Sequence, residues 1–196
     1  ILGARATTRL EHAWACTGQN QAYKKSIFNK VGGFSKISNQ IQGDDTLFLQ
    51  ICRNSFPIRT KFADSIHCRT ISRQENSWLS FLKQRIRWSG DAKLMWKYNP
   101  IFFIFIISTF LVPLLLIVTL LYSLIIENKY FYIFSYCILI HFILEFSLYL
   151  IGTNQTNRKI QINQYIFWFI SHIPYVVLMG ISSLFVRKLK WRGRQT

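Results

Sequence analysis

The chain has 196 residues and a formal net charge of +16, and 51% of its residues are hydrophobic. Long uncharged apolar runs in its second half exclude an ordinary soluble protein, and the aliphatic and aromatic content excludes a disordered basic tail. Because the sequence begins at Ile1 in the middle of a pattern, we interpret it as the C-terminal part of a longer protein.

Two short stretches of the basic first half favour strands. Residues 13–17 are mostly apolar and end at Gly18, and residues 57–63 alternate between apolar and polar side chains. Such alternation is typical of a strand with one buried face. We therefore expect residues 1–98 to be a mixed helical and stranded domain.

Three helices are predicted in the same half. Residues 26–31 form a short helix that Gly32-Gly33 ends, a common C-terminal signal. A second helix follows Asp44-Asp45, and its apolar face comprises Leu47, Phe48, Ile51 and Cys52. Residues 77–97 read as one amphipathic helix rich in Trp, Lys and Arg, which favours the membrane interface.

Residues 99–186 form the predicted membrane region. Its three apolar segments are residues 101–126, 130–151 and 165–186, and each is long enough to cross the hydrocarbon layer as a helix. The second segment carries His141 and Glu145, which are four residues apart and so share one helical face. A carboxylate in such a segment usually faces protein or water, which leaves a packing role and a functional role open.

The basic flanks of these segments constrain the topology. Residues 1–98, the loop at 152–164 and the tail at 187–196 are all basic and should all lie on the cytoplasmic side. Three full crossings would separate the first from the last. We therefore expect residues 165–186, which contain Pro174, to dip into the membrane and return or to lie at its interface.

The four cysteines carry no sign of a metal site. They are not arranged as a Cys-x-x-Cys pair, and no group of cysteine and histidine has zinc-ligand spacing. We expect free thiols in a reducing compartment.

Asp44-Asp45 is conspicuous because only eight acidic residues occur in the chain. One reading is simple capping of the following helix. The other is a general base at a helix N-terminus, where the helix dipole favours the carboxylate form that accepts a proton.

Gln84, Arg87 and Trp88 are the second group. Their spacing places an amide, a guanidinium and an indole on one helical face. Arginine binds a diphosphate through two hydrogen bonds, and tryptophan can stack on a sugar ring. The competing reading is a solvated basic helix whose tryptophan anchors it to the membrane.

Taken in order, these motifs resemble the membrane-bound family 2 glycosyltransferases, which include cellulose, hyaluronan and poly-N-acetylglucosamine synthases. Cys16-Thr17-Gly18 resembles the acceptor-side segment, Gly43-Asp44-Asp45 the acidic motif, and Gln84-Arg85-x-Arg87-Trp88 the Q-x-x-R-W signature. Membrane segments follow at once, and Lys190-Trp191-Arg192-Gly193-Arg194 resembles a common family ending.

The resemblance implies an α/β fold: residues 1–98 would be the C-terminal part of a cytoplasmic GT-A-like domain, followed by an α-helical membrane region. It implies Asp45 as catalytic base with Asp44 in support. Donor diphosphate would be bound by Arg87, Arg85 and Gln84. Acceptor would be bound by Trp88, Cys16, Thr17 and Gly18.

The implied reaction is inverting transfer from a nucleotide sugar to a lipid or growing polysaccharide acceptor at the membrane. The family's D-x-D motif, which holds Mg²⁺ or Mn²⁺, is not found in this sequence, so we expect the metal ligands to lie outside it and this piece to be inactive alone. The expected localisation is a multi-pass inner or plasma membrane.

Two other classes compete with this interpretation. A nucleic-acid-binding protein is suggested by charge alone, but the charge follows the membrane flanks and no binding motif accompanies it, so no nucleic-acid partner is expected. A transporter component or non-enzymatic membrane subunit would account for the apolar segments, but it leaves Asp45, Gln84 and Arg87 without a role.

Overall fold

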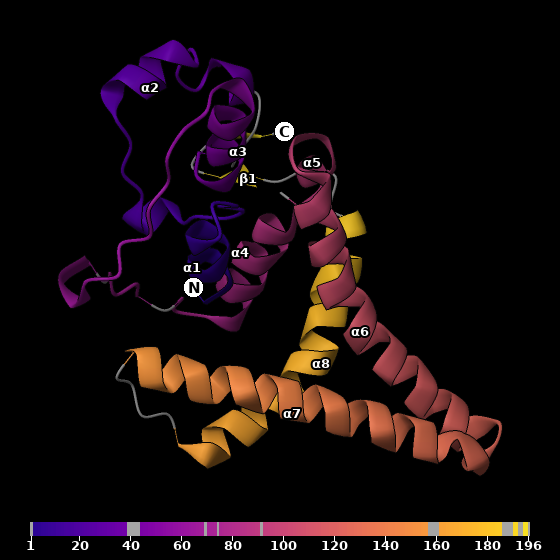
Figure 1. The fold of residues 1–196 in the computed structure, drawn as a ribbon. Helices are drawn as coiled ribbons and strands as arrows, with labels where there is room; N and C mark the ends of the chain where they lie inside the picture. Colours follow the sequence, from indigo (N-terminus) through magenta and orange to yellow (C-terminus); the bar gives the residue numbers. More distant parts are fainter. Residues whose placement is uncertain are drawn as a thin grey trace. The chain divides into compact units, whose positions relative to one another are not determined.

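A computed structural model describes residues 2–38, 44–68, 70–73, 75–90, 92–156, 161–185, 190–191 and 194–195. The chain divides into two compact units. Unit 1 comprises residues 1–106 and 182–196, and unit 2 comprises residues 107–181. Figure 1 labels the α-helices of both and the strand β1.

Unit 1 is built from short helices. They are α1 (Leu2–Arg9), η1 (Gly18–Asn20), α2 (Lys25–Lys30), η2 (Ser35–Ile37), α3 (Thr46–Ser55), η3 (Ile66–Cys68), α4 (Trp78–Gly90) and α5 (Ala92–Tyr98). Near the C-terminus, β1 (Lys190–Trp191) and β2 (Arg194–Gln195) form a two-residue antiparallel pair.

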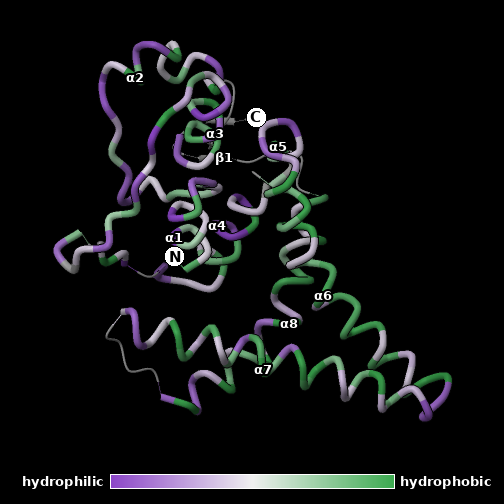
Figure 2. Tube along the Cα trace, viewed as in Figure 1, coloured by the Kyte–Doolittle hydropathy of each residue, from purple (hydrophilic) through white to green (hydrophobic). Residues whose placement is uncertain are grey.

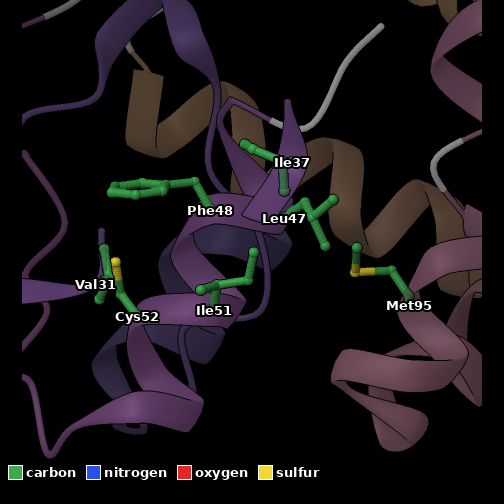
Figure 3. Close-up of a cluster of buried hydrophobic side chains, with 7 residues drawn as sticks. All are labelled: Val31, Ile37, Leu47, Phe48, Ile51, Cys52 and Met95. Atoms are coloured by element: carbon green, nitrogen blue, oxygen red, sulfur yellow. The ribbon is translucent and has the colours of Figure 1, made fainter. Parts of the chain in front are cut away.

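The hydrophobic core of unit 1 surrounds α3. Its predicted apolar face is buried, and Figure 3 shows these side chains gathered with residues from α5 and from the segment after α2. The core comprises Val31, Ile37, Leu47, Phe48, Ile51, Cys52 and Met95. Each large aliphatic or aromatic side chain removed from water contributes about 1.5–3 kcal/mol, so this cluster fixes α3 in place.

The turn after α2 confirms the glycine signal. Gly32 and Gly33 have φ of +83° and +60°, a conformation that glycine adopts without the penalty of a Cβ atom. The amide of Gly33 donates to the carbonyl of Phe28 at 2.8 Å, which closes the helix end. The chain then turns back so that Ile37 reaches the core.

The two predicted strands are wrong. Residues 13–17 and 57–63 have no strand assignment, because a strand needs a partner and the described part of unit 1 offers neither segment one. Residues 13–17 are instead bound to α3 by side chains. The predicted single helix at 77–97 is also divided, into α4 and α5. An α/β fold is thus not what the described residues display; the regular elements among them are helices apart from the β1–β2 pair.

Three long apolar helices follow. They are α6 (Pro100–Ile125), α7 (Phe131–Thr156) and α8 (Ile162–Phe185), with η4 (Asn128–Tyr130) before α7. Each is long and apolar enough to cross a membrane. Figure 2 shows α6 largely in the colour of hydrophobic residues. Because α8 is continuous, a segment that dips in and returns is not what the structure contains; crossing and lying at the interface both stay open.

Within unit 2, α7 and α8 contact each other through aromatic rings. Phe142 meets Tyr165 and Phe169 at centroid distances of 5.9 and 5.1 Å. His141, half-buried on the same helix, lies 5.5 Å from the Phe169 ring. The half-buried Glu145 shares that helix face. The contact of His141 with Phe169 is one that a packing role would make; for Glu145 both predicted roles stay predictions.

Candidate active site

Asp45 is the N-cap of α3. One carboxylate oxygen, Oδ1, accepts from the amide of Thr46, and the other, Oδ2, accepts from the amide of Gly18 at 3.2 Å. The side chain is half-buried. Backbone donors stabilise the anion and fix its orientation, while a carboxylate with about four acceptor positions keeps capacity for a further donor.

Residues 13–18 lie along the first two turns of α3. Thr46 Oγ1 donates to the carbonyl of Cys16 at 3.0 Å and accepts from its amide at 3.3 Å. Farther along α3, Gln50 Nε2 donates to the carbonyls of Ala13 and Trp14 at 3.0 and 2.7 Å. The segment therefore obtains from side chains the hydrogen bonds that a strand partner would have supplied.

Cys16 and Gly18, two predicted acceptor-side residues, are thus next to Asp45. Burial, the nearby carboxylate of Asp45 and, to a lesser degree, that of Asp44 raise the pKa of the Cys16 thiol to about 12, against an opposing hydrogen bond from Thr46. A thiol with that pKa is protonated near neutral pH and is not a nucleophile.

Thr17 and Asp44 have different positions. The Thr17 hydroxyl accepts from the amide of Gln19 at 3.4 Å and caps η1. Asp44 is exposed in the turn before α3, so its carboxylate is open to water while that of Asp45 is held by two amides. Gly43, the first residue of the predicted motif, lies outside the described residues.

The Gln/Arg/Trp group lies on α4, as predicted. The Arg85 guanidinium lies over the rings of Phe81 and Trp88, at 4.9 and 4.5 Å from their centroids. Gln84 Nε2 donates to Glu75 at 2.6 Å. Trp88 is 47% exposed, and Arg87 is half-buried.

The predicted site residues therefore form two clusters. Cys16 and Gly18 contact Asp45 and Thr46, whereas Gln84 binds Glu75 and the Arg85 guanidinium lies over the Phe81 and Trp88 rings. Both clusters belong to unit 1.

The divalent metal that the resemblance implies finds no ligand set in the described part of the chain. No three His, Cys, Asp or Glu side chains gather there as a metal site would require. These residues do not fit the group, and the expectation that its ligands lie outside the chain stays a prediction.

Sequence reasoning missed Thr46, Gln50 and Asn99. Gln50 is a polar residue 1% exposed among the buried residues of α3, and such a residue signals a hydrogen-bonding role because an unpaired buried amide is costly. Asn99 precedes Pro100, the arrangement of a helix N-cap followed by proline at the first helical position.

The chain thus combines an oriented carboxylate, a helix bearing guanidinium groups and three helices of membrane-spanning length. The chain matches the model of glycosyl transferase family 21 over residues 3–196 and belongs to that family, a GT-A family related to family 2. Membership indicates sugar transfer from a nucleotide sugar. Comparisons with curated proteins and with solved structures gave no match.

Proposed function

We propose that this chain is the acceptor-side part of an inverting glycosyltransferase. The enzyme moves a sugar from a nucleotide-sugar donor to a lipid or a growing polysaccharide acceptor at a membrane. Its GT-A-like α/β domain faces the cytoplasm of a multi-pass inner or plasma membrane protein, and Mg²⁺ or Mn²⁺ is held by residues outside this chain. Membership of family 21 and three membrane-length helices support this reading.

The environment of Asp45 carries the proposal. Its two carboxylate oxygens accept from two backbone amides, one on α3 and one on the acceptor-side segment. A base must be ionised and oriented before it can accept a proton from a hydroxyl. The same contacts that cap α3 orient the carboxylate, so the capping reading and the catalytic reading are compatible.

In the proposed transfer step each of these residues has one role. Asp45 accepts the proton of the acceptor hydroxyl as that oxygen attacks the anomeric carbon. The bond from the anomeric carbon to the diphosphate oxygen breaks on the opposite face, which inverts the configuration. Arg87, with Arg85 and Gln84, binds the departing diphosphate.

Acceptor recognition is assigned to the exposed Trp88 ring and to the segment that contacts Asp45. An indole face stacks on the apolar face of a sugar or lies along an alkyl chain. The Cys16 thiol, which stays protonated, together with the Thr17 and Gly18 backbone, shapes the surface next to the base.

The test is product formation by the full-length protein from a panel of labelled nucleotide sugars, with Asp45→Asn beside Asp44→Asn. Asparagine still caps a helix but does not accept the proton, so we expect Asp45→Asn to lower turnover by roughly 10²–10⁴-fold. Asp44→Asn, at an exposed carboxylate, should lower it less. Equal and mild losses at the two positions would refute the assignment.

A further inference from the structure

Gln50 uses its whole amide to join two parts of unit 1. Its side chain is 1% exposed. Nε2 donates to the carbonyls of Ala13 and Trp14, and Oε1 accepts from Asn99 Nδ2 at 3.0 Å. Burying an amide is tolerated when its donors and acceptor are satisfied, and here each of the two nitrogen-bound protons and the oxygen has a partner.

Asn99 extends this connection to the first apolar helix. Its Oδ1 accepts from the amide of Phe102 at 3.0 Å, which caps α6 directly before Pro100. Four residues after Gln50 on the same face of α3, Asn54 Nδ2 donates to the carbonyl of Tyr98 at 2.8 Å. Two amides of α3 therefore bind the junction between α5 and α6.

The hydrogen bonds that begin at Asn99 and Gln50 continue along residues 13–18 to Asp45. Along α3, Asp45 binds the amide of Gly18, Thr46 binds Cys16, and Gln50 binds Ala13 and Trp14. Residues 13–18 are thus hydrogen-bonded to α3 at three positions along the helix, Asp45, Thr46 and Gln50. Any shift of the first residues of this segment relative to Gln50 would move Gly18, which orients one oxygen of the Asp45 carboxylate.

A separate contact supports the same connection. The Trp14 ring lies 5.7 Å from the Phe102 ring and 5.5 Å from the Phe105 ring, centroid to centroid. Trp14 therefore packs on the first turns of α6, and its segment is also joined to the cap of α6 through Gln50.

We propose that Gln50 and Asn99 are positioning residues: the Asn99–Gln50 amide pair fixes the acceptor-side segment, and through it the Asp45 carboxylate, relative to the start of the first membrane helix. The inference rests on the proposed role of Asp45. It places the base at a fixed position with respect to the point where the chain enters the membrane region.

Two substitutions break the pair without removing the helix cap. Asn99→Asp and Asn99→Ser both keep an oxygen that can accept from the Phe102 amide, and both lose the amide donor to Gln50 Oε1. A flip of Gln50 would not repair Asn99→Asp, because the carbonyls of Ala13 and Trp14 need its nitrogen. The two variants differ in charge, so a shared effect reports the lost hydrogen bond.

Asn54→Asp is the matched control. Like Asn99→Asp, it introduces one carboxylate, here on α3. It removes the donor to the Tyr98 carbonyl at the same junction, but it leaves the hydrogen bonds of Gln50 with residues 13–18 and Asn99 in place. If the effect depends on the Gln50–Asn99 bond itself and not on any bond between α3 and the junction, kcat should fall much less in Asn54→Asp than in the Asn99 variants.

The measurement is steady-state kinetics of the full-length protein with the donor that the product assay identifies, together with thermal unfolding in detergent. For both Asn99 variants we expect kcat to fall roughly 10- to 10²-fold, the usual result of a small misplacement of a reacting group, with donor KM unchanged. The unfolding temperature should fall as well, because the buried Gln50 oxygen loses its donor, but the protein should stay folded at the assay temperature. A wild-type kcat in folded protein, or a loss confined to the unfolding temperature, would overturn the inference.

Asp45→Asn separates failure of this inference from failure of the proposed function. If the pair acts through Asp45, Asn99→Asp should cause little further loss in the Asp45→Asn background. Full additivity of the two losses would overturn the inference alone. Wild-type turnover by Asp45→Asn itself would overturn the proposed function.

Discussion

At the scale of single residues, Asp45 serves as a helix cap and as the proposed base. Its half-buried carboxylate is bound by the amides of Thr46 and Gly18, whereas the neighbouring carboxylate of Asp44 is exposed. Two adjacent acids thus have different environments, because only the second is in the N-cap position of α3.

The thiol of Cys16 offers a test of this environment that does not depend on activity. Burial is the largest cause of its raised pKa of about 12, and the Asp45 carboxylate is the next. Because the thiolate is the reactive form, we expect Cys16 to react with iodoacetamide at pH 8 far more slowly than the exposed Cys68. Alkylation should accelerate as the pH rises toward 12.

Removing the nearby charge should lower the Cys16 pKa. Asp45→Asn should therefore speed alkylation of Cys16 at fixed pH, and Asp44→Asn should speed it less, since Asp44 is a smaller cause. Rates are measured by peptide mass spectrometry on folded protein, with Cys68 as the internal reference. A greater effect of Asp44→Asn would contradict the arrangement of the carboxylates.

Trp88 is the residue for which acceptor and donor binding can be separated. Its ring is 47% exposed with the Arg85 guanidinium over it. We expect Trp88→Ala to raise the acceptor KM by up to about 10-fold, in line with the value of about 0.5–1.5 kcal/mol for aromatic contacts, and to leave the donor KM nearly unchanged. Trp88→Phe, which keeps an aromatic face, should recover most of the loss. A selective loss of nucleotide affinity would refute the stacking role.

At the scale of elements, sequence periodicity predicted the features that depend only on residues close together in the chain. The apolar face of α3, the glycine end of α2 and the three apolar helices follow from spacing within one segment. The strand at 13–17 was wrong because its polar backbone is satisfied by Thr46 and Gln50, about 30 to 37 residues away.

In the candidate site, too, the local features could be predicted from the sequence and the contacts between distant residues could not. Asp45 and the α4 group were recognisable from their motifs, whereas the bond between Gln50 and Asn99 joins residues 49 positions apart and leaves no periodic signal. A buried glutamine within an apolar stretch was the one available indication, and its partners could be found only in three dimensions.

Gly180 tests the packing of unit 2. A Cβ atom on Gly180 of α8 would lie 2.3 Å from Cδ2 of Phe110 on α6. Gly180→Ala should therefore lower the stability of the detergent-solubilised protein by about 1–3 kcal/mol, the usual cost of overpacking, and the double variant Gly180→Ala/Phe110→Leu should recover most of it.

Gly3→Ala is the control for Gly180→Ala, because nothing lies within 4 Å of a Cβ atom at that position of α1. Alanine there should be neutral or mildly stabilising, by the difference in helix propensity. Both are measured by thermal unfolding. Equal behaviour of the two alanine variants would show that α8 does not approach Phe110 as described.

At the scale of the whole molecule, the tail and the basic first half belong together. Residues 182–196 are part of the same compact unit as residues 1–106. The start of α6 and the end of α8 therefore belong to one unit. If unit 1 lies on one side of the membrane, only an even number of crossings connects the two, so one of the three helices does not cross. Because α8 has no break, its structure gives no reason to single it out as the helix that does not cross.

We therefore predict that residues 187–196 lie on the cytoplasmic side. Five of these residues are Arg or Lys, and moving them across the bilayer would oppose the orientation bias of basic flanks. In a background without Cys16, Cys52, Cys68 and Cys137, a cysteine at Thr196 should resist an impermeant maleimide in intact cells and react after permeabilisation. Asn128→Cys, in the turn between α6 and α7, should react in intact cells if α6 crosses. Labelling of both cysteines in intact cells would place the tail outside and would contradict the prediction, because the number of crossings would then be odd, as in three full crossings.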